Sequence, residues 1–387
     1  MDRGNNARPS TAEASIPCES GGTPLTCVLP AAARNLPPFT RSMPRADLLR
    51  ATERGLYCDA GNFYIDPWQP VDRALITHAH GDHARWGSRA YACAAESALV
   101  LRTRIGPDAP ITSWSWGETH EIDGVQISFH PAGHILGSAQ IRVEYRGETW
   151  VVSGDYKTEP DPTCTPFEPV RCNVFITEST FGLPIYRWTP QGETFADMAD
   201  WWSANGEAGR ASIVFAYALG KAQRILAGLA PLAKGEFYTH GAVERLNRDY
   251  REAGIALPAT TYAGSVSKGH DWKGAMIVAP PSAAGSSWLR RFSAASTAFA
   301  SGWMRVRGAR RRRSVDRGFV LSDHVDWPAL MSAIEATGAE RVLVTHGYRD
   351  TVVRTLRERG LSADSLASHW EGENEDDVAA EGEAIPE

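Results

Sequence analysis

The chain has 387 residues, of which 43% are hydrophobic and 22% are charged, and its net charge is −6. This composition excludes a fibrous or wholly disordered chain, and no apolar run reaches the roughly 20 residues that a transmembrane helix requires. The six cysteines form no CxxC pair, which argues against a disulfide framework and leads us to expect a cytoplasmic protein.

The two ends of the chain differ in composition from its middle. Residues 1–45 are rich in Pro, Ser, Ala, Gly and Thr without a period, so we expect a disordered leader with no secretory signal. Residues 367–387 form an acidic tail, in which positions 371–387 hold eight acidic residues and no basic one. The body between them is close to neutral, so contacts with nucleic acid must come from local basic patches.

Short strands and hairpins are predicted in the first half of the body. Apolar alternation and turn residues such as Asp123-Gly124 and Arg146-Gly147 indicate antiparallel pairs, and 96–104 reads as a short helix. The predicted strands lie within 57–65 and at 74–77, 121–122, 125–130, 139–145, 149–153 and 173–177.

Helices and strands alternate from about residue 189, which is typical of a parallel-sheet unit. The expected helices there are 195–202 and 220–229, and the expected strands are 212–217, 237–239, 275–279 and 296–300. The chain then continues with a strand at 318–321, a helix at 327–336, a strand at 341–345 and a helix at 350–359.

Metal-binding side chains follow the predicted strand at 74–77. Three histidines and an aspartate stand within six positions: His78, His80, Asp82 and His83. Imidazole and carboxylate together suit zinc, iron or manganese. The same design of an apolar stretch ending in a ligand residue recurs at His134, Asp155 and His346, which brings the total to the number of ligands that two neighbouring metals need.

The run His78-Ala79-His80-Gly81-Asp82-His83, followed by His134, Asp155 and His346, resembles the pattern of the metallo-β-lactamase superfamily. The resemblance implies an α/β fold, an αββα four-layer sandwich with two mixed sheets between outer helices. It implies that one metal is bound by His78, His80 and His134, and a second by Asp82, His83 and His346, with Asp155 bridging the two. Zinc is the expected metal, and manganese and iron are the alternatives.

Three further stretches resemble the β-CASP insert of nucleic-acid nucleases: 175–180 with Glu178, 215–224 with Lys221, and 321–327 centred on His324. The resemblance implies that a metallo-β-lactamase domain at 46–188 and 316–366 is interrupted by a β-CASP α/β subdomain at 189–315. Within that group, residues 54–58 and 66–73 are similar to bacterial ligase-associated DNA exonucleases, and the resemblance covers about 46–365.

By this resemblance the protein is a two-metal nuclease that hydrolyses DNA phosphodiester bonds, an exonuclease in DNA repair associated with a DNA ligase and a helicase. The alternative is a ribonuclease of the same architecture. Asp82 and Asp155 would orient the attacking water, and Glu178 and His324 would form an acid pair for the leaving oxygen. A helix cap or an outer partner of the metals is the structural alternative for Glu178. Two further rivals are weaker. A thioester or β-lactam hydrolase would not need the β-CASP insert, and a non-catalytic binding module would not need to keep all seven metal-binding residues.

Basic residues near these motifs are candidates for phosphate contacts, with a solvated surface position as the alternative for each. They are Lys157, Lys221, Arg310, Arg311, Arg312 and Arg313.

Overall fold

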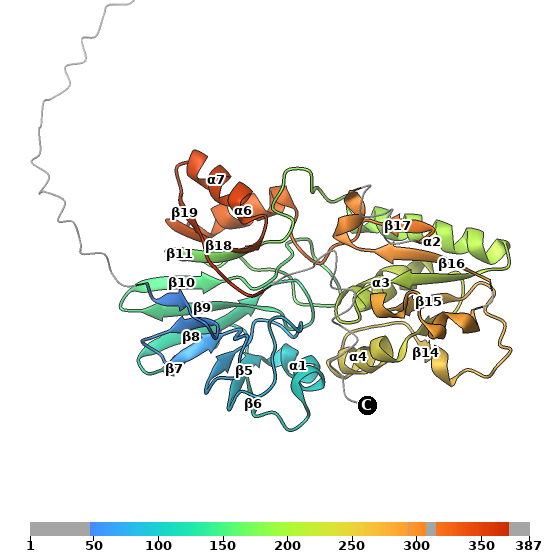
Figure 1. Ribbon diagram of the computed structural model, residues 1–387, viewed down its shortest axis with the longest axis horizontal. Coiled ribbons are helices and arrows are strands. Elements are labelled where there is room, and N and C mark those ends of the chain that lie inside the picture. Colours follow the sequence, from blue (N-terminus) through green and yellow to red (C-terminus); the bar gives the residue numbers. More distant parts are fainter. Residues whose placement is uncertain (1–46, 293, 307–314, 371–387) are drawn as a thin grey trace, which may run out of the picture. The chain divides into compact units, whose positions relative to one another are not determined.

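The computed structural model describes residues 47–292, 294–306 and 315–370 (Figure 1). The expected leader, the stretch 371–387 and the arginines at 310–313 lie outside the described residues. Three sheets with helices make up the described chain, which is a mixed α/β fold. Across the described residues, no helix has both the length and the apolar character that crossing a membrane requires.

The first sheet has six short strands in chain order. They are β1 (Leu49–Ala51), β2 (Leu56–Cys58), β3 (Phe63–Ile65), β4 (Ala74–Leu75), β5 (Tyr91–Ala94) and β6 (Ile111–Trp114). Strands β1 to β3 pair antiparallel and β3 to β6 pair parallel. The strand predicted at 74–77 ends at Leu75, because the N–H of Thr77 donates to the Asp66 carboxylate, at 2.7 Å, instead of to a neighbouring strand.

The second sheet has seven strands in the order β19-β18-β11-β10-β9-β8-β7. They are β7 (His120–Ile122), β8 (Val125–Pro131), β9 (Ala139–Tyr145), β10 (Glu148–Val152), β11 (Val174–Ser179), β18 (Arg341–Gly347) and β19 (Ser362–Ser365). Both predicted hairpins, β7–β8 and β9–β10, are confirmed, and their turn residues have the positive φ angles that such tight turns require.

The side chains of these two sheets share one hydrophobic core. It includes Phe63 and Leu75 from the first sheet and Phe129 and Trp150 from the second. Neighbouring residues of a strand point to opposite faces. Ile176 of β11 therefore joins this core, whereas Phe175 faces the opposite way and packs with α6 (Trp327–Thr337) and α7 (Arg349–Glu358). These two helices lie beside β18 and β19 in Figure 1.

The third sheet is entirely parallel, in the order β14-β13-β15-β12-β16-β17, as the alternation of helices and strands predicts. Its strands are β12 (Ala211–Phe215), β13 (Phe237–Thr239), β14 (Thr260–Tyr262), β15 (Met276–Ala279), β16 (Ala295–Ala300) and β17 (Arg317–Phe319). The helices α2 (Gln191–Glu207), α3 (Lys221–Leu229) and α4 (Gly241–Glu252) pack with this sheet, and α1 (Ala98–Ile105) packs with the first.

Helix α4 was not predicted, because its apolar face is only three side chains wide: Val243, Leu246 and Tyr250. Short 3₁₀ turns connect the other elements. They are Ala95–Ser97, Ala230–Leu232, Ala263–Ser265, Pro281–Ala283, Ser287–Arg291 and Gly302–Arg305.

Candidate metal centre

Every residue predicted to bind metal lies at or just beyond the end of a strand. His78 to His83 follow β4, His134 follows β8, Asp155 follows β10, and His346 lies near the end of β18. Glycine is needed at position 154, just before Asp155. The backbone there has a φ of +57°, which side chains disfavour, and a Cβ would lie 2.7 Å from the Cβ of Thr77.

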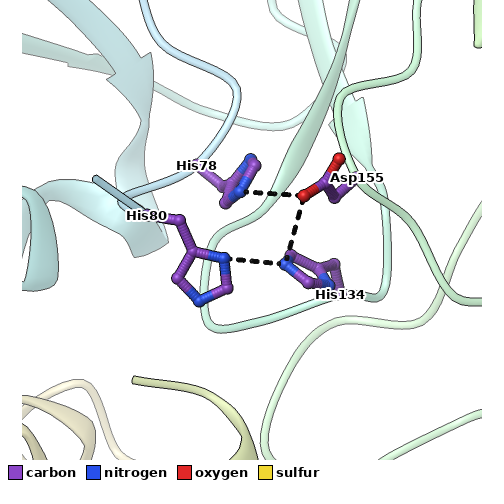
Figure 2. A group of neighbouring side chains, drawn as sticks. All are labelled: His78, His80, His134 and Asp155. Atoms are coloured by element: carbon purple, nitrogen blue, oxygen red, sulfur yellow. Dashed lines mark hydrogen bonds and ion pairs between the residues drawn. The ribbon is translucent and has the colours of Figure 1, made fainter. Parts of the chain in front are cut away.

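The predicted first group comes together as a compact cluster (Figure 2). One ligand atom from each of His78, His80, His134 and Asp155 lies within 4.8 Å of the others. Oδ2 of Asp155 is 3.5 Å from Nε2 of His78 and 3.9 Å from Nε2 of His134, and Nε2 of His134 is 3.1 Å from Nδ1 of His80. Four donors on one small volume can hold a divalent cation.

The predicted second group also surrounds Asp155. Nε2 of His346 is 3.2 Å from its Oδ1, and Nε2 of His83 is 3.7 Å from its Oδ2. Asp82 reaches this group through His83, since its Oδ2 is 3.4 Å from Nε2 of His83. The carboxylate of Asp155 therefore lies against members of both groups, which is the geometry that a bridging ligand needs.

Each histidine uses its other ring nitrogen in a hydrogen bond that orients the ring. His80 and His134 donate to the backbone oxygens of Leu219 and Asp323, and His83 bonds to the Asp66 carboxylate at 2.7 Å. His78 and His346 bond to the hydroxyl groups of the threonines that precede them. This arrangement directs one nitrogen of every ring into the cluster, as in protein metal sites.

The atoms directed into the cluster fit a bound cation. Nε2 of His78, His83 and His346 and Oδ1 of Asp155 are buried and accept or donate no hydrogen bond among the residues that the structure describes. Burial lowers the pKa of His78 and of His134 well below the usual range, so both are neutral and can donate a lone pair.

Negative charge also accumulates around His83. Burial lowers its pKa, but the carboxylates of Asp82, Asp155 and Asp66 outweigh burial and raise that pKa to about 10. The site thus draws positive charge, which divalent cations would supply.

Glu178 and His324 form a buried pair beside the cluster, although 146 residues separate them in the chain. Nδ1 of His324 lies 2.9 Å from both carboxylate oxygens of Glu178, and Glu178 also accepts from the N–H of Tyr156. Burial lowers the pKa of His324, but the charges of Glu178 and Asp155 outweigh it and the net shift is upward. These two residues and Asp155 also form a second compact group of potential metal-binding atoms.

The two predicted lysine contacts lie in the interior instead of on a solvated surface. Lys221 has a fully buried side chain, 3.4 Å from Asp323, and Lys157 is 3% exposed and pairs with Glu159 at 2.9 Å. Both cations are thus engaged with protein carboxylates, and their contact with a phosphate stays a prediction.

Sequence reasoning missed the residues that orient the ligands. Asp66 adopts a positive φ of 42° and holds both His83 and Thr77. Asp323 and Arg224 contact His134 from distant parts of the chain. Asp66, Arg224 and Asp323 all lie within the motifs recognised in the sequence, at 66–73, 215–224 and 321–327, and these motifs are the signal that could have indicated them.

A cavity of about 840 Å³ opens beside the loop that carries His80 and Gly81. Arg104 of α1 and Arg245 and Arg248 of α4 line it. A Cβ on Gly81 would lie 1.5 Å from Nη2 of Arg104, so this guanidinium rests directly on the loop. The cavity therefore joins positive side chains to the candidate metal centre.

Comparison with known proteins identifies relatives among nucleic-acid enzymes, although no family model matches the chain. The chain is 31% identical over 313 residues to a probable DNA ligase of Opitutus terrae, which covers 80% of this chain and 30% of the ligase. It is 27% identical over 235 residues to the ribonuclease TTHA0252 of Thermus thermophilus, which covers 51% of this chain and 52% of the relative. It is 28% identical over 203 residues to the cleavage and polyadenylation specificity factor 73 of Drosophila melanogaster, which covers 48% of this chain and 29% of the relative.

This chain spans less than two thirds of the length of each of these relatives. Among solved structures, its fold is similar to that of a protein of unknown function from Enterococcus faecalis, with a TM-score of 0.52, 10% identity, and coverage of 77% of this chain and 80% of the other.

Proposed function

This chain is a homologue of the β-CASP nucleases of the metallo-β-lactamase superfamily, and we propose that it is a two-metal nuclease that hydrolyses DNA phosphodiester bonds. The observation that carries the proposal is the cluster around Asp155, in which His78, His80 and His134 gather with this carboxylate within 4.8 Å, and Nε2 of His83 and of His346 approaches the same carboxylate at 3.7 and 3.2 Å. Such a cluster is costly without a cation to compensate its buried polar atoms.

In this proposal His78, His80 and His134 would hold one divalent cation, Asp82, His83 and His346 would hold the other, and Asp155 would be shared by both. Zinc is the expected cation, and manganese and iron are alternatives. When bound, such cations neutralise charge on phosphate oxygens and acidify water at neutral pH.

His324 serves the leaving oxygen as a proton donor. In the protonated ring, Nδ1 donates its hydrogen bond to the Glu178 carboxylate, so the proton on Nε2 is the one that is transferred to the leaving oxygen. The neighbouring carboxylates raise the pKa of His324 against the effect of burial, which favours the protonated ring near neutral pH. Glu178 in turn is fixed by the N–H of Tyr156, at 2.9 Å, so the acid is positioned before substrate binds.

The cavity beside His80 supports a polyanionic substrate. Arg104, Arg245 and Arg248 can neutralise successive phosphates, and the ring of Tyr262, which is 44% exposed, offers a stacking surface for a base. Such contacts bind any strand regardless of sequence, as an exonuclease requires.

DNA is the proposed substrate because a relative that matches 80% of this chain is named a probable DNA ligase. We propose accordingly that the enzyme is an exonuclease in DNA repair that works with a ligase. The rival is a ribonuclease, because several relatives that match shorter parts of this chain are named as such.

The fold proposal is an αββα sandwich at 46–188 and 316–366, interrupted by a β-CASP insert at 189–315. The shared core of the first two sheets and the helices on the outer face of the second support the sandwich. The parallel third sheet supports the insert, and the pairing of β17 with β16 extends that sheet to Phe319.

The test is cleavage of matched end-labelled DNA and RNA, single- and double-stranded, with and without a 5′-phosphate, by protein loaded with Zn²⁺ or Mn²⁺. We expect stepwise shortening of DNA that disappears in the Asp155→Ala variant. Preferred cleavage of RNA would favour the ribonuclease. A metal-loaded protein that cleaves no nucleic acid but hydrolyses a thioester or β-lactam would overturn the proposal.

A further inference from the structure

Four buried charges meet at the first turn of α3. Each of their side chains is at most 2% exposed, and they come from three separate stretches of the chain. They are Asp161 from the loop after β10, Lys221 and Arg224 from α3, and Asp323 from the loop before α6. We call this set the α3 charge cluster.

The α3 charge cluster is balanced, with two cations and two carboxylates. Nε of Arg224 is 3.0 Å from Oδ1 of Asp323 and 3.5 Å from Oδ2 of Asp161, and Nζ of Lys221 is 3.4 Å from Oδ2 of Asp323. Charges this deep in a protein persist only when they are paired, because their desolvation is costly. The loop of Asp323 is therefore held in one position by α3.

Arg224 also contacts the candidate metal centre. Its Nη2 donates to the backbone oxygen of His134, at 3.1 Å. The ring of His134 donates from Nδ1 to the backbone oxygen of Asp323, at 2.9 Å. A carbonyl oxygen can only accept, so this bond places the ring hydrogen on Nδ1 and leaves Nε2 to face His80 and Asp155.

His134 is thus held at its backbone by Arg224 directly, and at its ring through Asp323. The residue after Asp323 is His324, the proposed proton donor, so the same loop carries both functions. Neither contact reaches a substrate, and both act on groups that do.

We propose that Arg224 is a positioning residue, through which α3 sets the orientation of His134 and so the affinity of the centre for a divalent cation. The inference rests on the proposed role of His134 as a metal ligand. It makes the helix that follows β12 part of the metal centre, although none of its side chains binds the cation.

An arginine is required for this role because one guanidinium has five donors in a plane. Nη2 of Arg224 donates to the backbone oxygen of His134 at 3.1 Å and Nη1 to Oε1 of Gln191 at 3.5 Å, while Nε lies at ion-pair distance from Asp323 and Asp161. A lysine would keep the charge balance but offers a single ammonium group, which cannot reach all of these acceptors. The Arg224→Lys variant therefore keeps the positive charge but removes the hydrogen-bonding geometry of the guanidinium.

The experiment compares Arg224→Lys with Arg251→Lys in the full chain. Arg251 is a matched control, since it pairs with a carboxylate, Glu244, and donates to a backbone oxygen, that of Pro258. The metal-free proteins are titrated with Zn²⁺ against a chromogenic chelator, and thermal unfolding without metal checks their folds. We expect Arg224→Lys to bind one of two ions about tenfold more weakly, with unchanged KM and lower kcat. Arg251→Lys should match the wild type.

Wild-type Zn²⁺ affinity at both positions in a folded Arg224→Lys variant would overturn the proposal. If that variant does not fold, the double variant Arg224→Gln with Asp161→Asn keeps the charge balance and must show the same loss of affinity. A wild-type protein that binds no Zn²⁺ would instead refute the proposed function, so the two failures are distinguishable.

Discussion

Replacement of Glu178 by glutamine should slow hydrolysis while leaving the bound metal in place. The change preserves the shape of the side chain but removes the charge that faces His324 at 2.9 Å. Glutamine can still accept from the N–H of Tyr156, so the backbone there keeps its partner. The variant therefore tests the charge of the pair more than its packing.

The size of the effect follows from the geometry of the pair. Opposite charges about 3 Å apart, at an effective dielectric constant of about 20, attract by about 5 kcal/mol. Loss of that attraction leaves Asp155 to oppose burial without Glu178, so the pKa of His324 falls and less of the ring is protonated near neutral pH. Because general acid catalysis contributes about 10²- to 10⁴-fold, we expect kcat to fall by about 10²-fold or more.

The pH profile gives a second measure of the same interaction. A raised pKa keeps His324 protonated to higher pH, and its proton is lost as the pH rises through that value. The alkaline limb of kcat should therefore move to lower pH in Glu178→Gln. The stability that the charged pair contributes is likewise lost as the pH rises through the raised pKa of His324.

The assay is single-turnover cleavage of end-labelled DNA, with metal content measured on the same samples. Glu168→Gln is the control, because Glu168 also pairs with a histidine, His130, at 3.7 Å, but its side chain is 60% exposed. Wild-type kcat in Glu178→Gln would refute the acid pair. Loss of one metal equivalent would instead show that Glu178 and His324 hold a cation with Asp155, a grouping that their spacing allows.

Three other outcomes are expected. Asp155→Ala should lower the metal content and abolish hydrolysis, since Asp155 contacts both groups of histidines, and activity retained in a metal-loaded sample would contradict the two-metal site. Removal of metal by a chelator should lower the melting temperature, and excess Zn²⁺ at about 100 times its Kd should restore about 2.7 kcal/mol of stability; equal melting curves would mean that the folded site binds no Zn²⁺. Arg245→Ala with Arg248→Ala should reduce the slope of log affinity for DNA against log salt by about 2, and an unchanged slope would remove the cavity beside His80 from the substrate path.

Local patterns predicted the elements that carry the site with good accuracy. Turn residues at 123–124 and 146–147 located two hairpins, because positive φ angles demand particular residues at particular positions. Apolar runs located β11 and β18, which are buried on both faces. Helix α4 escaped prediction, since its few apolar side chains, although they lie on one face, are outnumbered by charged and polar ones.

The local sequence did not predict which charged side chains are buried. Lys221 reads equally well as a phosphate contact or a solvated residue, yet it lies in the interior against Asp323, about 100 residues away. Its neighbour Arg224 acts on His134, which is 90 residues away. Such partners become visible only when distant segments pack, because pairing and desolvation are properties of the packed interior.

By itself the sequence determined which side chains are available to bind metal, their order and their placement at strand ends. Those features depend on residue type and on the short-range periodicity of the backbone. Only the tertiary structure decided that Asp155 lies between both groups of histidines and that Glu178 meets His324. It also decided that α3 holds His134, since these contacts join segments that the chain brings together by packing its sheets and not by any local preference.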